Sequence, residues 1–384
     1  MIPALLLIAS FVGAACIAAG LNYFGSFSWR RSIGKHWTER ARLLYPIRVS
    51  RTLNLFLISA CAILGCLAAN QGWRDFWPFC GLAAFCGALL GSYPLDHQIL
   101  PELNFKRWFS QLLVISGSRL LIYGPLLVVA IFLPRHWGWK MGLVILMAAL
   151  WHLWIVSFGF SVVLRWVGVL KPLPNMAVSV LQECFDKTSI TPCNLWLIRT
   201  PLMYAAALPV TKGLIFSDGM LNKCNEGELR AICFHELAHL AEGRAVIFKR
   251  IAGSFTLFPW VLINPSMGAW GHAGLTLIYM LMALMMVFNR RLNRSLEVRA
   301  DGLAAGHDAT DGEYAKVLEK LYMLNQMPAV MESKNRAHPH LYDRMMAAGV
   351  IPDYERPGTP DHVSWTIFPP IAAGIALWYI AFKM

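Results

Sequence analysis

Charged side chains are scarce in this chain of 384 residues. Only 15% of the residues are Asp, Glu, Lys or Arg, whereas 57% are hydrophobic, and no internal repeat or low-complexity tract is evident. A soluble domain usually carries about 25% charged residues and about 45–50% apolar ones. The shortage of charge therefore excludes an ordinary soluble domain and predicts a multi-pass membrane protein.

Acidic residues are fewer than basic ones, 22 against 34, which gives a formal net charge of +12. A basic balance of this kind raises the question of nucleic acid, but no nucleic-acid-binding module is found in the sequence. Basic residues beside membrane spans attract an anionic leaflet by about 1 kcal/mol each, and this role explains most of the excess. We therefore expect the lipid bilayer and a protein or peptide substrate as partners, and no nucleic acid. The nine cysteines follow no metal-binding or redox spacing.

Long apolar runs are what the sequence has in abundance. A membrane-spanning helix needs about 20 mainly apolar residues. Eight candidates lie near residues 2–22, 53–69, 77–93, 110–133, 141–164, 250–267, 270–289 and 364–382. The third and the sixth are the weakest, because the third is short and rich in glycine and the sixth contains two prolines. The first has no basic residues ahead of it, so we expect a retained span and no cleaved signal peptide.

The distribution of basic residues predicts the orientation in the membrane, because short cytoplasmic loops collect Lys and Arg. The loop after the first span is rich in arginine, whereas the second loop offers only Arg74 and the fourth only Arg135 and Lys140. We therefore expect the first loop in the cytoplasm and the amino terminus outside. Alternation then places the region after the fifth span in the cytoplasm. The membrane would be the inner cell membrane of a bacterium or the endoplasmic reticulum of a eukaryote.

A metal-binding motif lies in this cytoplasmic region. His235, Glu236 and His239 form the pattern H-E-x-x-H. Residues four apart share one face of a helix, so the two imidazoles can bind one metal ion while the carboxylate takes a proton from metal-bound water. Asn225 and Glu228 form a capping-box signature ahead of the motif, which indicates that it lies on a helix. A catalytic zinc ion usually has a third protein ligand.

A second pair of acids offers that ligand. Glu297 and Asp301 are also four apart, just after a hydrophobic segment. One can bind the metal while the other accepts a hydrogen bond from a liganding imidazole. Alternatively, the two acids lie on an amphipathic helix beside the membrane and pair with nearby Arg294 and Arg299.

The stretch from 165 to 224 predicts a small sheet ahead of the motif helix. Apolar runs at 195–198 and 214–216 are typical of strands, and residues 211–213 of a turn. A free sheet edge can bind an extended peptide through main-chain hydrogen bonds. The candidate edge consists of Tyr204, Ala205, Ala206, Ala207 and Leu208. An ordinary core hairpin is the alternative.

These motifs together resemble the HtpX and type-one CAAX prenyl protease family of membrane gluzincins, whose signature is HExxH followed by ExxxD. The resemblance runs roughly from residue 195 to 350 and includes residues 213–221, the helix from Glu228 to His239, and a late stretch at 338–344 that begins His-Pro and ends in Arg. The chain departs from the family at 203–209, where the family often has an Asn-Ala pair. The antirepressor-type sensor peptidases of beta-lactam resistance are also similar, notably at 263–265.

The resemblance implies a role for each matching residue. One zinc ion per chain is expected on His235, His239 and Glu297, with Glu236 as the general base. Asp301 is expected to accept a hydrogen bond from a liganding histidine and so fix its tautomer. His338 and Arg344 are expected to stabilise the oxyanion, as donors placed where negative charge develops. His340 is two residues from His338 and can take its place.

The sequence thus predicts a mainly α, multi-pass membrane protein with about 7–8 spans and a small α/β zinc-peptidase subdomain at the cytoplasmic face. The expected segments are 1–164 with about five spans, 165–249 with the sheet and motif helix, 250–289 with two spans, 290–362 with the ExxxD helix, and 363–384 with the last span. We expect an endopeptidase for membrane-associated or misfolded proteins. The alternatives are a dedicated maturation or signalling protease, of the CAAX-processing or antirepressor-sensor type, and a non-catalytic scaffold that kept the fold.

Overall fold

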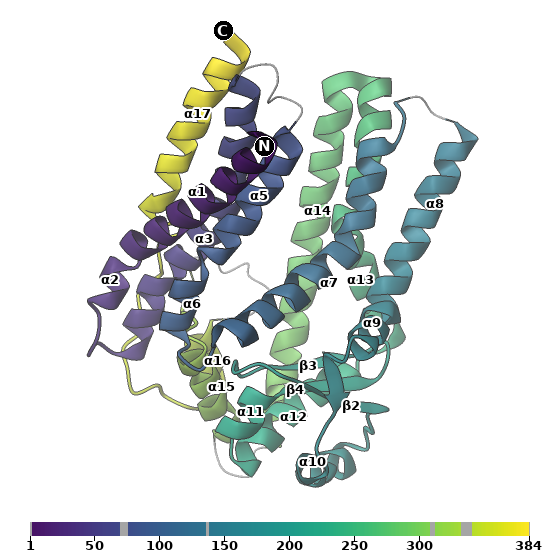
Figure 1. Cartoon of the computed structure of the whole chain (residues 1–384). Coiled ribbons are helices and arrows are strands. Elements are labelled where there is room, and N and C mark those ends of the chain that lie inside the picture. The colour runs from purple at the N-terminus through teal and green to yellow at the C-terminus, as the bar shows by residue number, and fades with distance from the viewer. Residues whose placement is uncertain (1, 70–75, 136–137, 308–311, 332–339, 384) are drawn as a thin grey trace. The chain divides into compact units, whose positions relative to one another are not determined.

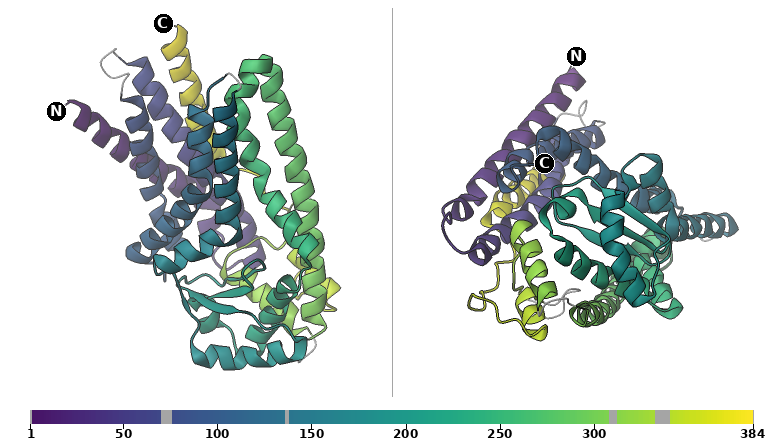
Figure 2. Two further views of the ribbon diagram at one scale, coloured as in Figure 1. Left: turned by 90° about the vertical axis from the view of Figure 1, so that its right-hand side faces the viewer. Right: turned by 90° about the horizontal axis from the view of Figure 1, so that it is seen from below.

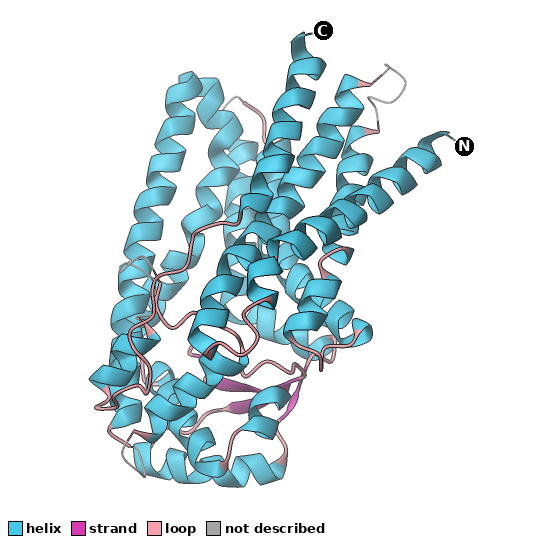
Figure 3. Cartoon of the chain, turned by 90° about the vertical axis from the view of Figure 1, so that its left-hand side faces the viewer, coloured by secondary structure: helices cyan, strands magenta, loops and turns pink. Residues whose placement is uncertain are grey.

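The computed structural model describes all residues except 1, 70–75, 136–137, 308–311, 332–339 and 384. Most of the described chain is helical, and the strands form one small sheet (Figure 3). The chain divides into two compact units. The first comprises Met1–Trp108, Tyr322–Glu332 and Asp353–Met384, and the second comprises Phe109–Leu321 and Ser333–Pro352. The mainly α class expected from the sequence is confirmed, whereas the five expected segments stay a prediction.

The first unit is a helical bundle. Its elements are α1 (Ile2–Gly25), α2 (Phe27–Arg30), α3 (Trp37–Ala68), α5 (Trp77–Leu90), α6 (Tyr93–Ile99), the 3₁₀ turn η3 (Trp365–Ile367) and α17 (Phe368–Lys383). Small residues let α1 and α5 approach closely. A Cβ added at Gly87 would lie 2.0 Å from the carbonyl oxygen of Phe11, and one added at Gly91 would lie 2.3 Å from that of Ala15. Such backbone contact is how membrane helices gain packing energy without a hydrophobic driving force.

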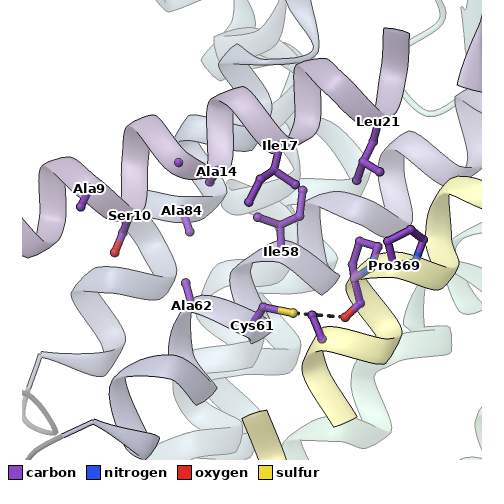
Figure 4. Close-up of a pocket in the computed structure, with 13 residues that line it drawn as sticks. Ala9, Ser10, Ala14, Ile17, Leu21, Ile58, Cys61, Ala62, Ala84 and Pro369 are labelled. Carbon is purple, nitrogen blue, oxygen red and sulfur yellow. Dashed lines mark hydrogen bonds between the residues drawn. The ribbon is translucent and has the colours of Figure 1, made fainter. Parts of the chain in front are cut away.

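A cavity of about 520 Å³ lies beside this helix contact (Figure 4). Its walls come from α1, α3, α5 and the start of α17 and are almost entirely apolar, with Ala14, Ile17 and Ile58 among the lining residues. The thiol of Cys61 donates a hydrogen bond to the carbonyl oxygen of Pro370 at one side. This bond joins α3 to the first turn of α17.

The second unit contains the remaining elements. Its helices are α7 (Phe105–Phe132, which begins in the first unit), α8 (Trp139–Trp154), the π-helical η1 (Ile155–Gly159), α9 (Phe160–Trp166), α10 (Asn175–Thr188), α11 (Asp218–Lys223), α12 (Glu226–Leu240), α13 (Arg244–Ser254), the 3₁₀ helix η2 (Phe255–Leu262), α14 (Ile263–Ala305), α15 (Glu313–Leu324) and α16 (Leu341–Ala347). Its strands are β1 (Leu170–Pro172), β2 (Asn194–Ile198), β3 (Ala205–Leu208) and β4 (Gly213–Ser217).

Seven helical segments of the described chain are long and apolar enough to cross a membrane. They are Ala4–Gly25, Trp37–Ala68, Trp77–Ile99, Phe105–Phe132, Trp139–Trp166, Arg244–Ala305 and Trp365–Phe382. Each of the eight runs expected from the sequence lies inside one of these segments to within two residues at its ends, and Arg244–Ala305 contains two of them. These segments mark an integral membrane protein.

The 62-residue segment Arg244–Ala305 is a hairpin and not one straight helix. The backbone of Gly271 takes a φ of 55°, which breaks the helical path inside α14. The chain reverses there, so that the long arm of α14 runs back beside α13 and η2 (Figure 1). A left-handed φ of this kind is readily adopted only by glycine. The hairpin therefore confirms that two apolar runs, at 250–267 and 270–289, are separate.

The sheet has the strand order β1-β2-β4-β3, with β2 and β4 parallel and both outer pairs antiparallel. Strands β2 and β4 are the two that the apolar runs predicted. Side chains alternate between the faces of a strand. Ile215 packs with Phe160 and Leu164 from α9 on one face, and Leu214 and Phe216, which face the other way, are completely buried. Helices lie on both sides of the sheet (Figure 2). The central strand β4 is therefore buried on both faces, and α12 packs beside its neighbour β3.

Candidate metal centre

Helix α12 carries the H-E-x-x-H motif, and its start is fixed locally. The side chain of Asn225 accepts a hydrogen bond from the backbone N–H of Glu228 at 2.8 Å, and the Glu228 carboxylate accepts one from the Asn225 N–H at 2.9 Å. This is the capping box that the sequence predicts. The helix then buries its second half almost completely, with His235, Glu236 and His239 all less than 9% exposed.

The two histidines face the carboxylate of Glu297 on α14. Nε2 of His235 lies 3.7 Å from one Glu297 oxygen, and Nε2 of His239 lies 3.6 Å from the other. One ligand atom from each of the three residues lies within 4.8 Å of the other two. Metal–nitrogen and metal–oxygen bonds of about 2.0–2.1 Å in a tetrahedron place ligand atoms about 3.3 Å apart. The three side chains thus fit a single metal ion with a small inward adjustment.

Two side chains contact the second ring nitrogen of His235, the one that faces away from Glu297. Nδ1 of His235 lies 2.8 Å from the hydroxyl of Tyr314 and 3.2 Å from a carboxylate oxygen of Asp301. The Tyr314 hydroxyl donates to Asp301 at 2.6 Å, so its oxygen is left to accept from the imidazole. Burial raises the pKa of Tyr314 well above its ordinary value, which keeps this donor protonated. The contacts hold the proton of His235 on Nδ1 and leave Nε2 free for the metal.

Arg344 from α16 binds the same cluster. Its Nε donates to one oxygen of Asp301 at 2.7 Å, and a terminal nitrogen donates to the other oxygen at 2.6 Å and to the Tyr314 hydroxyl at 2.9 Å. Two parallel bonds between Arg and a carboxylate are among the stronger charge-assisted contacts. Arg344 therefore fixes Asp301, a contact that the sequence did not suggest. Its expected contact with an oxyanion stays a prediction.

A different carboxylate lies behind His239. Glu242 Oε1 lies 2.9 Å from Nδ1 of His239, and Arg250 from α13 donates to both oxygens of Glu242, with 2.6 Å between Nε and Oε2. Burial alone raises the pKa of Glu242, but the hydrogen bonds from His239 and Arg250 outweigh it and lower the pKa below its ordinary value. Glu242 is therefore an ionised acceptor for the imidazole N–H.

The candidate substrate edge is the outer strand β3 and the residue before it. Strand β3 contains Ala205, Ala206, Ala207 and Leu208, pairs with β4 on one side only, and lies next to α12. Its other side carries no further strand among the described residues. Tyr204 immediately precedes it and is half exposed. A free edge thus lies beside the metal-binding helix, while peptide binding at this edge stays a prediction.

One expected site residue cannot be placed. His338 lies outside the described residues, whereas its alternative His340 is buried at the start of α16. The described structure thus brings together His235, Glu236, His239, Glu297, Asp301 and Arg344. The choice between His338 and His340 stays open.

The sequence analysis missed three residues of this site, namely Tyr314, Glu242 and Arg250. Tyr314 is 79 positions from His235, so only the tertiary fold brings the two together. Glu242 carried a local signal, because it is three positions after His239 and residues three apart are neighbours on a helix. A search for acids one turn from each histidine would have found it.

One comparison with known proteins found a match to a family. The family model of peptidase family M48 matches residues 183–349, which include α12, the long arm of α14 and α16. No curated protein gives a significant match. All three candidate metal ligands and the residues behind them lie within the matched range.

Proposed function

We propose that this protein is a zinc-dependent endopeptidase held in a membrane, because residues 183–349 match the family model of peptidase family M48. The observation that supports this best is the convergence of His235, His239 and Glu297, with Glu236 on the same buried turn. Two imidazoles and one carboxylate with a position left open are the ligand set of catalytic zinc in peptidases. A purely structural zinc site usually has four protein ligands and needs no adjacent base.

The proposed reaction is hydrolysis of a peptide bond. Bound zinc would supply Lewis-acid chemistry, lowering the pKa of a water ligand to about 7 and polarising a carbonyl. Glu236 takes a proton from the attacking water and gives it to the leaving amine. His235 and His239 are held in the right tautomer by the groups behind them. Arg344 secures Asp301, and we propose that it and His338 also stabilise the oxyanion.

The substrate is proposed to be a membrane-associated or misfolded protein. An extended segment would add as a strand to the free edge of β3, from Tyr204 to Leu208. Main-chain hydrogen bonds then supply affinity without demanding a particular side-chain sequence. Because β3 lies next to α12, such a strand would pass close to Glu236. The positive loops support a site that faces the cytoplasm.

Replacing the base separates chemistry from metal binding. Glu236→Gln in the full-length protein should keep one zinc per chain and lose about 10²–10⁴-fold in cleavage rate, the usual contribution of a general base. Glu297→Gln should lower the zinc content instead. Glu226→Gln is a matched control, because Glu226 lies on the same helix with its side chain 70% exposed.

The assay should offer an unfolded membrane protein and a prenylated peptide side by side, with a chelator control. Preference for the prenylated peptide would redirect the proposal to a dedicated maturation protease. A Glu236→Gln protein that cuts at the normal rate would overturn the assignment, as would a wild-type protein that cuts neither substrate.

A further inference from the structure

Glu242 is an acid in an unfavourable place. It lies two residues after Leu240, the last residue of α12, and its side chain is only 2% exposed. The carboxyl end of a helix carries partial negative charge, so an anion there is destabilising. Burial adds a desolvation cost to any ionised carboxylate. Helix stability therefore does not account for an acid at position 242.

The contacts of Glu242 suggest what offsets this cost. One oxygen lies 2.9 Å from Nδ1 of His239, and Arg250 reaches both oxygens from the next helix. Nε2 of His239 faces Glu297, so the proton of the neutral ring must sit on Nδ1, where Glu242 accepts it. Arg250 neutralises the carboxylate and fixes its orientation with two bonds.

We propose that Glu242 and Arg250 are positioning residues that orient His239 and set the affinity of the centre for its metal ion. This inference rests on the proposed metal centre, because it assigns a role only if His239 is a ligand. The two histidines are then held by separate devices, His235 by Asp301 with Tyr314 and Arg344, and His239 by Glu242 with Arg250. Arg250 lies on α13, the first arm of the membrane hairpin, so this arm contributes directly to the metal site.

The affinity of the full-length protein for Zn²⁺ tests this role. Competition with a chromophoric chelator gives the Kd without any assay of cleavage. Removing a carboxylate that supports a liganding histidine typically costs 10–100-fold in metal affinity. Glu242→Gln should weaken Zn²⁺ binding within that range, and Arg250→Gln should weaken it as well. The double variant should lose less Zn²⁺-binding free energy than the two single variants lose together, because both changes act on one contact.

Two further variants, one control and one milder substitution, complete the test. Glu183→Gln removes surface ion pairs with Lys187 and with Arg230 on α12 but contacts neither the metal ligands nor the residues that support them, so its Kd should match that of the wild type. Arg250→Lys keeps the charge but not the two parallel bonds, and should give an intermediate Kd even if Glu242→Gln fails to fold.

The outcomes separate this inference from the proposed function. A wild-type protein that binds one Zn²⁺, with Glu242→Gln and Arg250→Lys variants of unchanged Kd, would overturn the inference and leave the peptidase assignment intact. A folded wild-type protein that binds no Zn²⁺ would overturn both. Weaker binding in the Glu242 and Arg250 variants, with Glu183→Gln unchanged, supports the role assigned here.

Discussion

At the scale of single residues, Tyr314 is buried and makes several polar contacts at once. Its ring is 2% exposed and stacks on His235 at 5.6 Å between centroids. Its hydroxyl donates to Asp301 and accepts from Arg344 and from the imidazole. One oxygen therefore satisfies three polar groups that are partly or wholly removed from water.

Replacement of this hydroxyl tests whether the cluster supports the metal. Tyr314→Phe keeps the ring but deprives Arg344 of an acceptor and Asp301 of a donor, each a loss of about 1–3 kcal/mol if left unsatisfied. We expect Zn²⁺ binding about 10–100-fold weaker and a lower melting temperature. Tyr279→Phe is the control, because Tyr279 is half exposed on α14. Wild-type affinity in Tyr314→Phe would show that Asp301 and Arg344 suffice.

The sequence predicts the candidate metal ligands for a physical reason. Spacings of four residues act through the helix itself, so His235 with His239, and Glu297 with Asp301, need no knowledge of the fold. The groups behind them come from other elements, such as Tyr314 on α15 and Arg250 on α13. Their contacts depend on how those helices pack, which no short pattern encodes.

At the scale of elements, α12 depends on its first turn. The capping box of Asn225 and Glu228 satisfies two backbone donors, and Glu228 also accepts from Lys320 on α15 at 2.8 Å. Because α12 carries both histidines, the start of this helix helps to hold the metal site together.

Removal of the cap should therefore destabilise the fold around α12 without changing the candidate metal ligands or Glu236. Asn225→Ala is expected to lower the free energy of unfolding by about 1 kcal/mol, within the range of about 0.5–2 kcal/mol for such caps. Asn225→Asp keeps an equally good cap and should be near neutral. Thermal unfolding followed by protease resistance provides the comparison. Equal melting temperatures for Asn225→Ala and wild type would contradict this view of α12.

Element prediction succeeded where the pattern was local and strong. The apolar runs predicted each of the seven candidate spans among the described residues, and β2 and β4 lie at the two apolar stretches. Strand β1 was missed because it has three residues and ends in Pro172, which lacks a donor for the sheet ladder. Its place at the edge of the sheet, beside β2, is where proline is tolerated, and only the tertiary structure reveals it.

At the scale of the whole molecule, the charge distribution predicts an orientation. Basic residues gather in the first loop and after the fifth span, and the hairpin turn near Gly271 is expected on the opposite side. The proposed cytoplasmic site thus requires that the turn of this hairpin and the sheet region lie on different sides of the membrane.

Cysteine labelling in intact cells tests this orientation. Trp270 and Lys187 are both exposed, the first beside the hairpin turn and the second on α10. In a parent protein whose exposed cysteines Cys16, Cys86 and Cys193 are replaced by serine, Trp270→Cys should react with a membrane-impermeant thiol reagent. Lys187→Cys should react only after permeabilisation, because its side would be cytoplasmic. The reverse pattern would place the metal centre outside, and labelling of both in intact cells would mean that Arg244–Ala305 does not cross the membrane.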